Sequence, residues 1–273
     1  MASTDKDYSE SLKGQVAVVT GAGAGIGREI TERLAALGAS VAAIDINTKD
    51  ADEAIATIRQ GGGYGCSYQC DVSDSGQVTE TFSKIQEELG NVDILVNNAG
   101  VVSSPGLPFT NNTEADWDRT FAINVKSITF TAKAVAEGMM ARGNGRIINI
   151  SSITGVIAAP FMPPYSVSKT AANGLTRVLA RDFAPYGVTV NAICPGFIWS
   201  PLWEDLGNVM VEASGGDQGK SGREVFNGRI ESLVPMKREQ HAWEIASTVS
   251  FLCSEGARNI TGQIISVDGG ITI

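Results

Sequence analysis

A glycine-rich stretch near the amino terminus lies between a short apolar run and an amphipathic segment. The apolar run, Gln15 to Val19, is rich in β-branched residues and predicts a buried parallel strand. It continues into Thr20-Gly-Ala-Gly-Ala-Gly-Ile-Gly27, and a helical pattern from Arg28 to Leu37 follows. Glycines allow a tight turn and a close approach of a pyrophosphate to the backbone, while the amides of a helix N-terminus attract anions. This order of strand, loop and helix therefore predicts a dinucleotide-binding unit.

An aspartate ends the next apolar run. Residues 40–44 predict the second strand, and Asp45 follows eighteen positions after Gly27 (45 − 27). A carboxylate at this place accepts hydrogen bonds from the adenosine ribose hydroxyls and repels a 2′-phosphate. The glycine-rich loop and the three residues after Asp45 contain no Arg or Lys, although Arg28 and Lys49 are close by. The sequence therefore favours NAD over NADP as the cofactor; the alternative is a plain aspartate at a strand end.

Strand-like runs alternate with helical patterns along the chain. The runs lie at about 16–20, 40–44, 64–69, 92–96, 145–150, 188–193 and 263–267. With 273 residues and 43% hydrophobic content, the chain is long enough for one large core without a second domain. We predict the α/β class, with a single-domain Rossmann-type doubly wound sheet of seven parallel strands and helices on both faces. This domain spans residues 12–273 and follows a flexible segment at 1–11.

Three side chains in the second half of the chain form a pattern suited to proton transfer. Tyr165 and Lys169 are four residues apart (169 − 165) in a helical pattern, so their side chains share one helix face. A nearby ammonium favours the phenolate, and a phenol can exchange a proton with an alcohol or carbonyl oxygen. Ser152 adds a hydroxyl donor, and its neighbour Ser151 is the rival for this role. Together these residues predict oxidoreductase chemistry.

Five motifs in chain order resemble those of the short-chain dehydrogenase/reductase family, in its compact, NAD-preferring form. They are Thr20-Gly-x-x-x-Gly-x-Gly27, Asn97-Asn98-Ala99-Gly100, a helix asparagine at Asn124, Ser152 with Tyr165-x-x-x-Lys169, and Pro195-Gly196. The resemblance covers roughly residues 12 to 273. It implies hydride transfer between a nicotinamide and a carbinol carbon, with Tyr165 as general acid or base and Ser152 holding the substrate oxygen. Lys169 would lower the phenol pKa and bind the nicotinamide ribose.

The resemblance also implies which residues bind the cofactor, NAD. Asn98 would brace the central strand, Asp71 would bond the adenine, and Asn124 would seat a water near Lys169 through a kinked helix backbone. The family usually carries a threonine after Pro195-Gly196 that binds the carboxamide, and Ser200 keeps that hydroxyl here. The expected cofactor contacts are Gly21, Gly25, Ile26, Gly27, Asp45, Asp71, Val72, Asn98, Ala99, Gly100, Tyr165, Lys169, Pro195, Gly196, Ile198 and Ser200.

The segment from Trp199 to Glu239 is long, at 41 residues (239 − 199 + 1), and predicts a substrate lid. Its first part carries large apolar side chains at helical spacing. Its middle, 215–222, is polar and rich in glycine, which predicts a hinge or mobile tip. The alternative is that Trp199, Leu202 and Trp203 only pack this segment onto the core or onto another subunit.

The opposite wall of the predicted pocket is the segment 153–162, which contains no charged residue. An apolar pocket favours a hydrophobic or cyclic secondary alcohol or ketone over a free sugar. A polyol or sugar dehydrogenase is the alternative, with Glu204, Asp205, Asn208 and Arg223 of the lid turned inward. A 3-oxoacyl reductase and a non-catalytic NAD-binding sensor rank lower. The expected substrate contacts are Ser152, Thr154, Ala158, Phe161, Trp199, Leu202 and Trp203.

Charge and cysteine content exclude several other classes. A net charge of −9 and a pI near 4.7 argue against binding to nucleic acid, an anionic membrane or an acidic carrier protein. The absence of any run of about 18 apolar residues predicts a cytoplasmic protein. Cys66, Cys70, Cys194 and Cys253 lack partner ligands at metal spacing, so we expect reduced thiols and no metal site. The single histidine, His241, and the lack of a Gly-x-Ser-x-Gly elbow exclude a Ser-His hydrolase.

The remaining expectation concerns assembly. Long helical patterns at about 113–141 and 163–184, with residues 262–273, resemble the surfaces through which the family forms tetramers. Met139-Met140 and the terminal Ile271-Thr272-Ile273 are apolar and would otherwise face water. We therefore expect a homotetramer that acts on a small-molecule alcohol or ketone.

Overall fold

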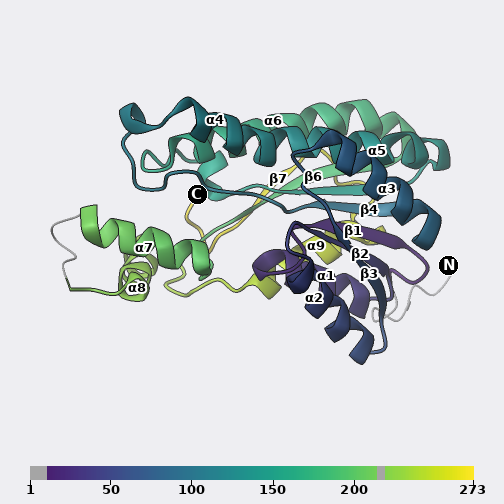
Figure 1. Ribbon diagram of the computed structural model, residues 1–273, viewed down its shortest axis with the longest axis horizontal. Coiled ribbons are helices and arrows are strands. Elements are labelled where there is room, and N and C mark those ends of the chain that lie inside the picture. Colours follow the sequence, from purple (N-terminus) through teal and green to yellow (C-terminus); the bar gives the residue numbers. More distant parts are fainter. Residues whose placement is uncertain (1–10, 214–218) are drawn as a thin grey trace.

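The computed structural model describes residues 11–213 and 219–273, and a sheet of seven strands lies at its centre (Figure 1). The strands are β1 (Val16–Thr20), β2 (Ser40–Asp45), β3 (Tyr64–Gln69), β4 (Val92–Asn97), β5 (Gly145–Ile150), β6 (Val188–Pro195) and β7 (Ile264–Val267). Their order is β3-β2-β1-β4-β5-β6-β7, and every neighbouring pair is parallel. The predicted sheet is confirmed. The predicted flexible segment at 1–11 lies, apart from Ser11, outside the described residues.

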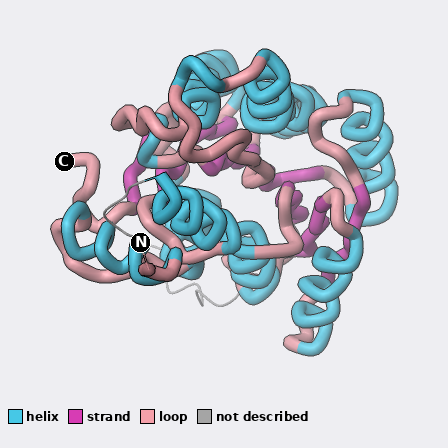
Figure 2. Tube along the Cα trace, turned by 60° about the vertical axis from the view of Figure 1, so that its left-hand side comes forward, coloured by secondary structure: helices cyan, strands magenta, loops and turns pink. Residues whose placement is uncertain are grey.

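Helices cover both faces of this sheet (Figure 2). They are α1 (Gly25–Ala36), α2 (Thr48–Gln60), α3 (Ser75–Leu89), α4 (Glu114–Phe121), α5 (Ser127–Arg142), α6 (Pro163–Phe183), α7 (Pro201–Ala213), α8 (Gly222–Leu233) and α9 (Ala242–Cys253). The helices α1, α2 and α9 pack on one face, and α3, α5 and α6 pack on the other. Within the described ranges, no helix is both long and apolar enough to cross a membrane.

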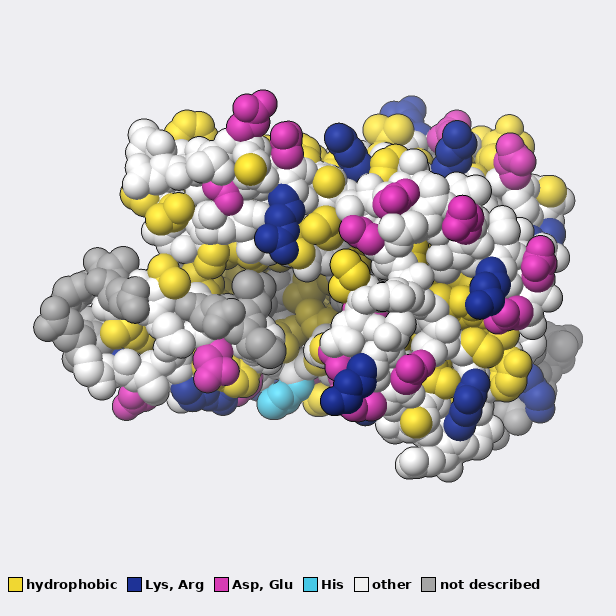
Figure 3. Space-filling view, in the orientation of Figure 1, with side chains coloured by type: hydrophobic (Ala, Val, Ile, Leu, Met, Phe, Trp, Pro, Cys, Tyr) yellow, Lys and Arg dark blue, Asp and Glu magenta, His cyan; other side chains and the backbone are white. Residues whose placement is uncertain are grey.

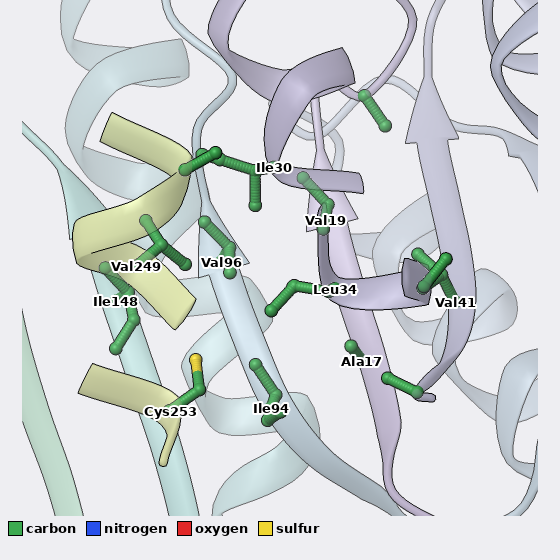
Figure 4. Packing of buried hydrophobic residues seen from close by; sticks show 14 of the residues in the cluster. Ala17, Val19, Ile30, Leu34, Val41, Ile94, Val96, Ile148, Val249 and Cys253 are labelled. Atoms are coloured by element: carbon green, nitrogen blue, oxygen red, sulfur yellow. The ribbon is translucent and has the colours of Figure 1, made fainter. Parts of the chain in front are cut away.

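Side chains that alternate along the strands pack into two hydrophobic cores, one on each face of the sheet. Val18 of β1 joins the core under α3, α5 and α6, whereas Ala17 and Val19 join the core under α1, α2 and α9. Figure 4 shows the core under α1, α2 and α9, where Leu34 of α1 and Val249 of α9 pack over strand residues of β1, β4 and β5. Because helices cover both faces of the sheet, the central strand β1 is buried and apolar up to Thr20, and functional side chains are left to the carboxyl edge of the sheet.

The order in which successive strands are added to the sheet reverses between β1 and β4. The strands β2 and β3 lie on one side of β1, and β4 to β7 lie on the other. In open parallel sheets, ligands bind outside the carboxyl ends of the strands at such a point. The segments that follow these ends are the glycine-rich loop, Asp45, Asn98 to Gly100, Ser152 and Pro195-Gly196. The fold therefore brings five separated motifs to one edge.

The helix predicted over 113–141 is interrupted. Between α4 and α5, a π-helical turn spans Ala122–Lys126, with Asn124 buried inside it. Such turns widen the helix by one residue and are common at functional sites. The predicted kink at Asn124 therefore takes the form of a π turn. Met139, expected to face water, is instead buried on the inner side of α5, because it lies on the helix face that packs on the sheet.

The predicted lid contains two helices, α7 and α8, beyond the carboxyl end of β6 (Figure 1). They approach closely at two glycines, because a Cβ on Gly207 would lie only 2.6 Å from the Gly222 Cα atom. Ser221 caps α8 in a reciprocal capping box with Glu224. The hinge predicted at 215–222 is therefore wrong at Ser221 and Gly222, which begin a helix. Its residues 215–218 lie outside the described part of the chain.

Candidate active site

Ser152, Tyr165 and Lys169 come together at one cavity beyond the ends of β5 and β6. Tyr165 and Lys169 are carried by α6, and the Lys169 Nζ atom lies 5.5 Å from the centre of the Tyr165 ring. The ammonium donates a hydrogen bond to the Ile150 carbonyl oxygen at 2.9 Å, which ties α6 to the end of β5. The three side chains thus share one site, as the spacing predicted.

The two neighbouring serines have different partners. The Ser151 hydroxyl donates to the Lys169 carbonyl oxygen at 3.2 Å, so it is committed to the backbone of α6. The Ser152 hydroxyl oxygen accepts a hydrogen bond from the Thr154 amide at 3.1 Å and interacts with the Tyr165 phenol. Ser152 is therefore the serine whose hydroxyl lies beside the phenol, whereas the Ser151 hydroxyl bonds the backbone of α6.

Burial dominates the protonation of this pair. Burial raises the pKa of Tyr165 to about 12, although the Ser152 hydroxyl acts in the opposite direction. Burial lowers the pKa of Lys169 to about 8. The resemblance implied a phenol pKa lowered by Lys169, whereas burial of the phenol raises this pKa. The Tyr165 phenol is therefore protonated at neutral pH.

The Asn124 side chain clamps the loop after β4 onto α6. Its Oδ1 atom accepts from the Val101 amide, and its Nδ2 atom donates to the Val101 carbonyl oxygen and the Ser168 hydroxyl, each at 2.9 Å. The Ser168 hydroxyl in turn donates to the Tyr165 carbonyl oxygen at 2.7 Å. Ser168 is completely buried and was not predicted from the sequence, because a serine in a helical run carries no distinguishing signal.

The glycine-rich loop leaves room that a side chain would fill. A Cβ on Gly27 would lie 1.9 Å from the Gly21 carbonyl oxygen and 2.5 Å from the Asn98 Nδ2 atom, so only glycine fits there. Asn98 Nδ2 donates to the Thr20 and Gly21 carbonyl oxygens at 3.0 and 2.9 Å, and thereby holds the loop to β4. The first turn of α1 contains no acidic residue, which leaves its amides available to a phosphate. These residues fit a dinucleotide.

Asp45 lies beside this loop. Its carboxylate accepts from the Gly23 amide at 2.9 Å and from the Asn47 amide at 3.0 Å. The nearby Arg28 guanidinium bonds Glu32 at 2.8 Å and Thr57 at 3.2 Å, so it is engaged away from the ribose position. Asp71, at the expected adenine position, accepts from the Ser73 amide and hydroxyl at 2.9 and 2.7 Å.

The cavity has a volume of about 500 Å³. Figure 3 shows this hollow between the lid helices and the sheet, with hydrophobic side chains inside it. The predicted residues that line it are Gly25, Ile26, Asn98, Gly100, Ser152, Thr154, Ala158, Phe161, Tyr165, Lys169, Pro195, Gly196, Ile198, Trp199, Ser200 and Trp203. Gly21, Gly27, Asp45, Asp71, Val72 and Ala99 do not line it. The side chain of Leu202, which belongs to α7, lies outside the described part of the structure.

Trp203 has two kinds of contact. It lines the cavity, and its ring also packs edge-on against Phe197 and Phe226, at centroid distances of 4.9 and 5.1 Å. Trp199 packs edge-on against Phe226 at 5.2 Å. These aromatic contacts hold α7 and α8 together above the end of β6. The sequence offered a substrate contact and a packing role as alternatives, and Trp203 is placed for both.

Three polar lid residues that the sequence offered for a polyol substrate, Arg223, Glu204 and Asn208, do not line the cavity. Arg223 forms an ion pair with Glu239 at 2.5 Å and lies 4.8 Å from the centre of the Trp199 ring. Glu204 and Asn208 are exposed and do not line the cavity, and the side chain of Asp205 lies outside the described residues. The inward orientation considered for a polyol substrate is therefore wrong for Arg223, Glu204 and Asn208. Arg229 and Leu233 also line the cavity, and the sequence did not single them out.

Comparisons with known proteins agree with this geometry. The family described as "Enoyl-(Acyl carrier protein) reductase" matches residues 21–272. The chain is 39% identical to an "Uncharacterized oxidoreductase" of Thermotoga maritima, over 96% of this chain and 99% of that protein. It is 36% identical to a "3beta-hydroxysteroid dehydrogenase" of Mediterraneibacter gnavus, over 94% and 95%. The crystal structure of an NAD+-bound xylitol dehydrogenase superposes with a TM-score of 0.88 and 35% identity, over 95% and 99% of the two chains.

Proposed function

The chain belongs to the short-chain dehydrogenase/reductase family of oxidoreductases, and we propose that this member is an NAD-dependent enzyme that interconverts a secondary alcohol and a ketone. The observation that carries the proposal is the meeting of Ser152, Tyr165 and Lys169 in one cavity with the glycine-rich loop. A phenol, a hydroxyl and an ammonium around one point are the groups that proton transfer at a carbinol oxygen requires.

Tyr165 moves the proton at the substrate oxygen. In reduction it donates this proton, and its raised pKa keeps the phenol protonated at neutral pH for that step. In oxidation it must accept the proton, which positive charge nearby favours. When bound, the nicotinamide supplies or accepts the hydride and adds a positive charge in its oxidised form.

Ser152 and Lys169 orient the reactants. The Ser152 hydroxyl lies beside the phenol and donates a hydrogen bond to the substrate oxygen. Lys169 is buried and tied to the Ile150 carbonyl oxygen, which fixes its ammonium near both the phenol and the cofactor ribose. Asn124 holds the Val101 backbone against α6, and so positions the floor of the site.

The preference for NAD rests on charge at the ribose position. The Asp45 carboxylate lies against the Gly23 amide and would repel a 2′-phosphate. Arg28 is paired with Glu32, so a 2′-phosphate could gain this cation only by breaking an existing pair. Both observations support NAD as the cofactor.

The apolar cavity supports a hydrophobic or cyclic substrate. Its walls combine the uncharged segment after Ser152 with Trp199, Trp203 and Leu206 of the lid. The Thr154 hydroxyl oxygen is buried and has no hydrogen-bond partner among the described residues, so a polar atom of the substrate would satisfy it. A polyol dehydrogenase is the alternative, and the similarity to a xylitol dehydrogenase favours it.

An NAD-coupled activity screen over secondary alcohols of graded polarity tests this function. The proposal expects NAD reduction with cyclic and hydrophobic alcohols at higher kcat/KM than with xylitol or threitol. The reverse order would assign the chain to the polyol class. No NAD reduction with any alcohol, and no NADH oxidation with the matching ketones, would contradict the proposed reaction.

The same proposal includes a homotetramer in the cytoplasm. Val167 and Val178 are exposed large apolar side chains on α6, and Trp243 and Phe251 are exposed on α9. Ile273 is also fully exposed. Ile271 differs from this pattern, because it lines the cavity. Apolar surface of this kind favours burial between copies of a chain.

A further inference from the structure

One charged side chain of the cavity has no part in the proton transfer. Among the described residues that line the cavity, only Lys169 and Arg229 are charged, and none is acidic. Lys169 is buried at the reacting position. Arg229 lies on α8, in the lid, and Leu233 one turn further along the helix lines the cavity with it. The cavity is therefore apolar apart from a catalytic end and one cationic side chain on the lid.

Among the described residues, the Arg229 side chain differs from those of Arg223 and Arg238 in having no hydrogen-bond or ion-pair partner. Arg223 on the same helix is paired with Glu239, and Arg238 is paired with Glu244 at 2.8 Å. In the part of the chain that the structure describes, no hydrogen bond or ion pair of the Arg229 side chain is found. The positions three and four residues away on α8 are Val225, Phe226, Ser232 and Leu233, so its helix offers it no carboxylate.

We propose that Arg229 binds an anionic group of the substrate, such as a carboxylate, sulfonate or phosphate, joined by an apolar body to the carbinol or ketone at Tyr165. This inference rests on the proposed function and narrows its substrate class. A guanidinium presents paired N–H donors that match the oxygens of such a group. The chain carries a net charge of −9, which repels anions at long range, so an anionic substrate needs a local cation.

The cofactor diphosphate is the other anion that enters this cleft. It has its own site, because the glycine-rich loop and the first turn of α1 supply amides, and that first turn carries no acidic residue. Arg229 belongs to the lid rather than to this loop, and its cavity neighbours Leu233 and Ile271 are apolar. The substrate is therefore the source of the anion that we assign to Arg229.

The test compares matched substrates in three variants. Oxo acids from 4-oxopentanoate to 8-oxononanoate and their methyl esters are offered with NADH to the wild-type enzyme and to the Arg229→Gln, Arg229→Lys and Arg181→Gln variants. Arg181 is an exposed residue of α6 that does not line the cavity, so its variant controls for the loss of one positive charge. For at least one chain length, we expect the wild type to prefer the acid over its ester in kcat/KM.

The Arg229→Gln variant should lower this acid-to-ester ratio by about tenfold or more, because a charge-assisted hydrogen bond is lost. Arg229→Lys should retain part of the ratio, and Arg181→Gln should retain all of it. Added salt should reduce the ratio in the wild type, since Arg229 is exposed. A ratio that Arg229→Gln leaves at the wild-type value would overturn the proposal.

Two further readouts separate the remaining outcomes. The affinity for NADH, measured by fluorescence titration, should be the same in Arg229→Gln and Arg181→Gln. A selective loss of NADH affinity in Arg229→Gln would assign Arg229 to the cofactor diphosphate and overturn the substrate assignment. Calorimetric binding of the oxo acids to the NAD-loaded enzyme tests the role of Arg229 without turnover. If the proposed reaction itself fails, neither the acids nor the esters are reduced, and this outcome is distinct from a loss of acid binding in Arg229→Gln.

Discussion

The Asp45 carboxylate accepts a hydrogen bond from the Gly23 amide at 2.9 Å, across the mouth of the glycine-rich loop. A Cβ on Gly23 would lie 3.1 Å from the same carboxylate oxygen, so the loop and the end of β2 fit closely. The carboxylate is thereby held beside the loop that we expect to bind the cofactor. This contact links the conformation of the loop to the choice of cofactor.

The first prediction concerns that choice. NAD should be preferred over NADP by at least about tenfold in kcat/KM, or about 1.4 kcal/mol, because a 2′-phosphate would lie against Asp45. Asp45→Ala should narrow this preference, chiefly by raising the KM for NAD. Steady-state kinetics with both cofactors measure it, and equal or better turnover with NADP in the wild type would contradict the prediction.

The second prediction concerns pH and stability. Burial lowers the pKa of Lys169 to about 8 from 10.5, so between these values the unfolded chain binds a proton that the folded chain does not. The contribution of Lys169 to folding therefore becomes more favourable as the pH rises through this window. From pH 7 to pH 10, the unfolding free energy of the wild type should gain about 2 kcal/mol relative to Lys169→Met. Denaturant titrations of both proteins measure this, and a pH-independent difference would contradict it.

The third prediction concerns the lid. Trp203→Ala should lower the unfolding free energy by about 2 kcal/mol, since the contacts with Phe197 and Phe226 are lost from a partly buried ring. It should also raise the KM for a bulky cyclic alcohol more than that for 2-butanol. Tyr64→Ala, at an exposed position of β3, is the control for both measurements. A loss of stability with an unchanged KM ratio would leave Trp203 with a packing role alone.

The fourth prediction concerns assembly. Light scattering at micromolar concentration should give the mass of four chains of 28.6 kDa. A charged residue on the exposed face of α6, such as Val178→Asp, should reduce this mass, because Val178 is 64% exposed in the single chain. A monomeric mass for the wild type would refute the tetramer.

The fold was predictable because its signals are periodic or local. Apolar runs such as Gln15 to Val19 are buried on both faces, and the strand-loop-helix order around Gly27 fixes the first crossover. The placement of Tyr165 and Lys169 beside each other was predictable, because their spacing of four residues puts both side chains on one face of a helix. The start of α1 was placed too late, at Arg28 instead of Gly25, because glycines in a helix N-terminus look like a loop.

Other features depend on tertiary contacts that a sequence does not display. Ser168 acquires its role only through the approach of the π turn to α6, and Arg229 reaches the cavity only through the packing of α8 on α7. The phenol pKa of Tyr165 depends on burial, which raises it and which a sequence does not display. Arg223 is held away from the cavity by its ion pair with Glu239, sixteen positions later (239 − 223), a pairing that the sequence does not display.

The most direct test of the proposed mechanism is the turnover of Tyr165→Phe. This change removes the proton at the reacting oxygen and keeps the ring that lies beside Lys169. We predict that kcat falls by about 10² or more for the best alcohol found, while the Kd for NADH stays within about twofold of the wild-type value. Near-normal turnover by Tyr165→Phe would contradict the assignment of Tyr165 as the acid and base of this site.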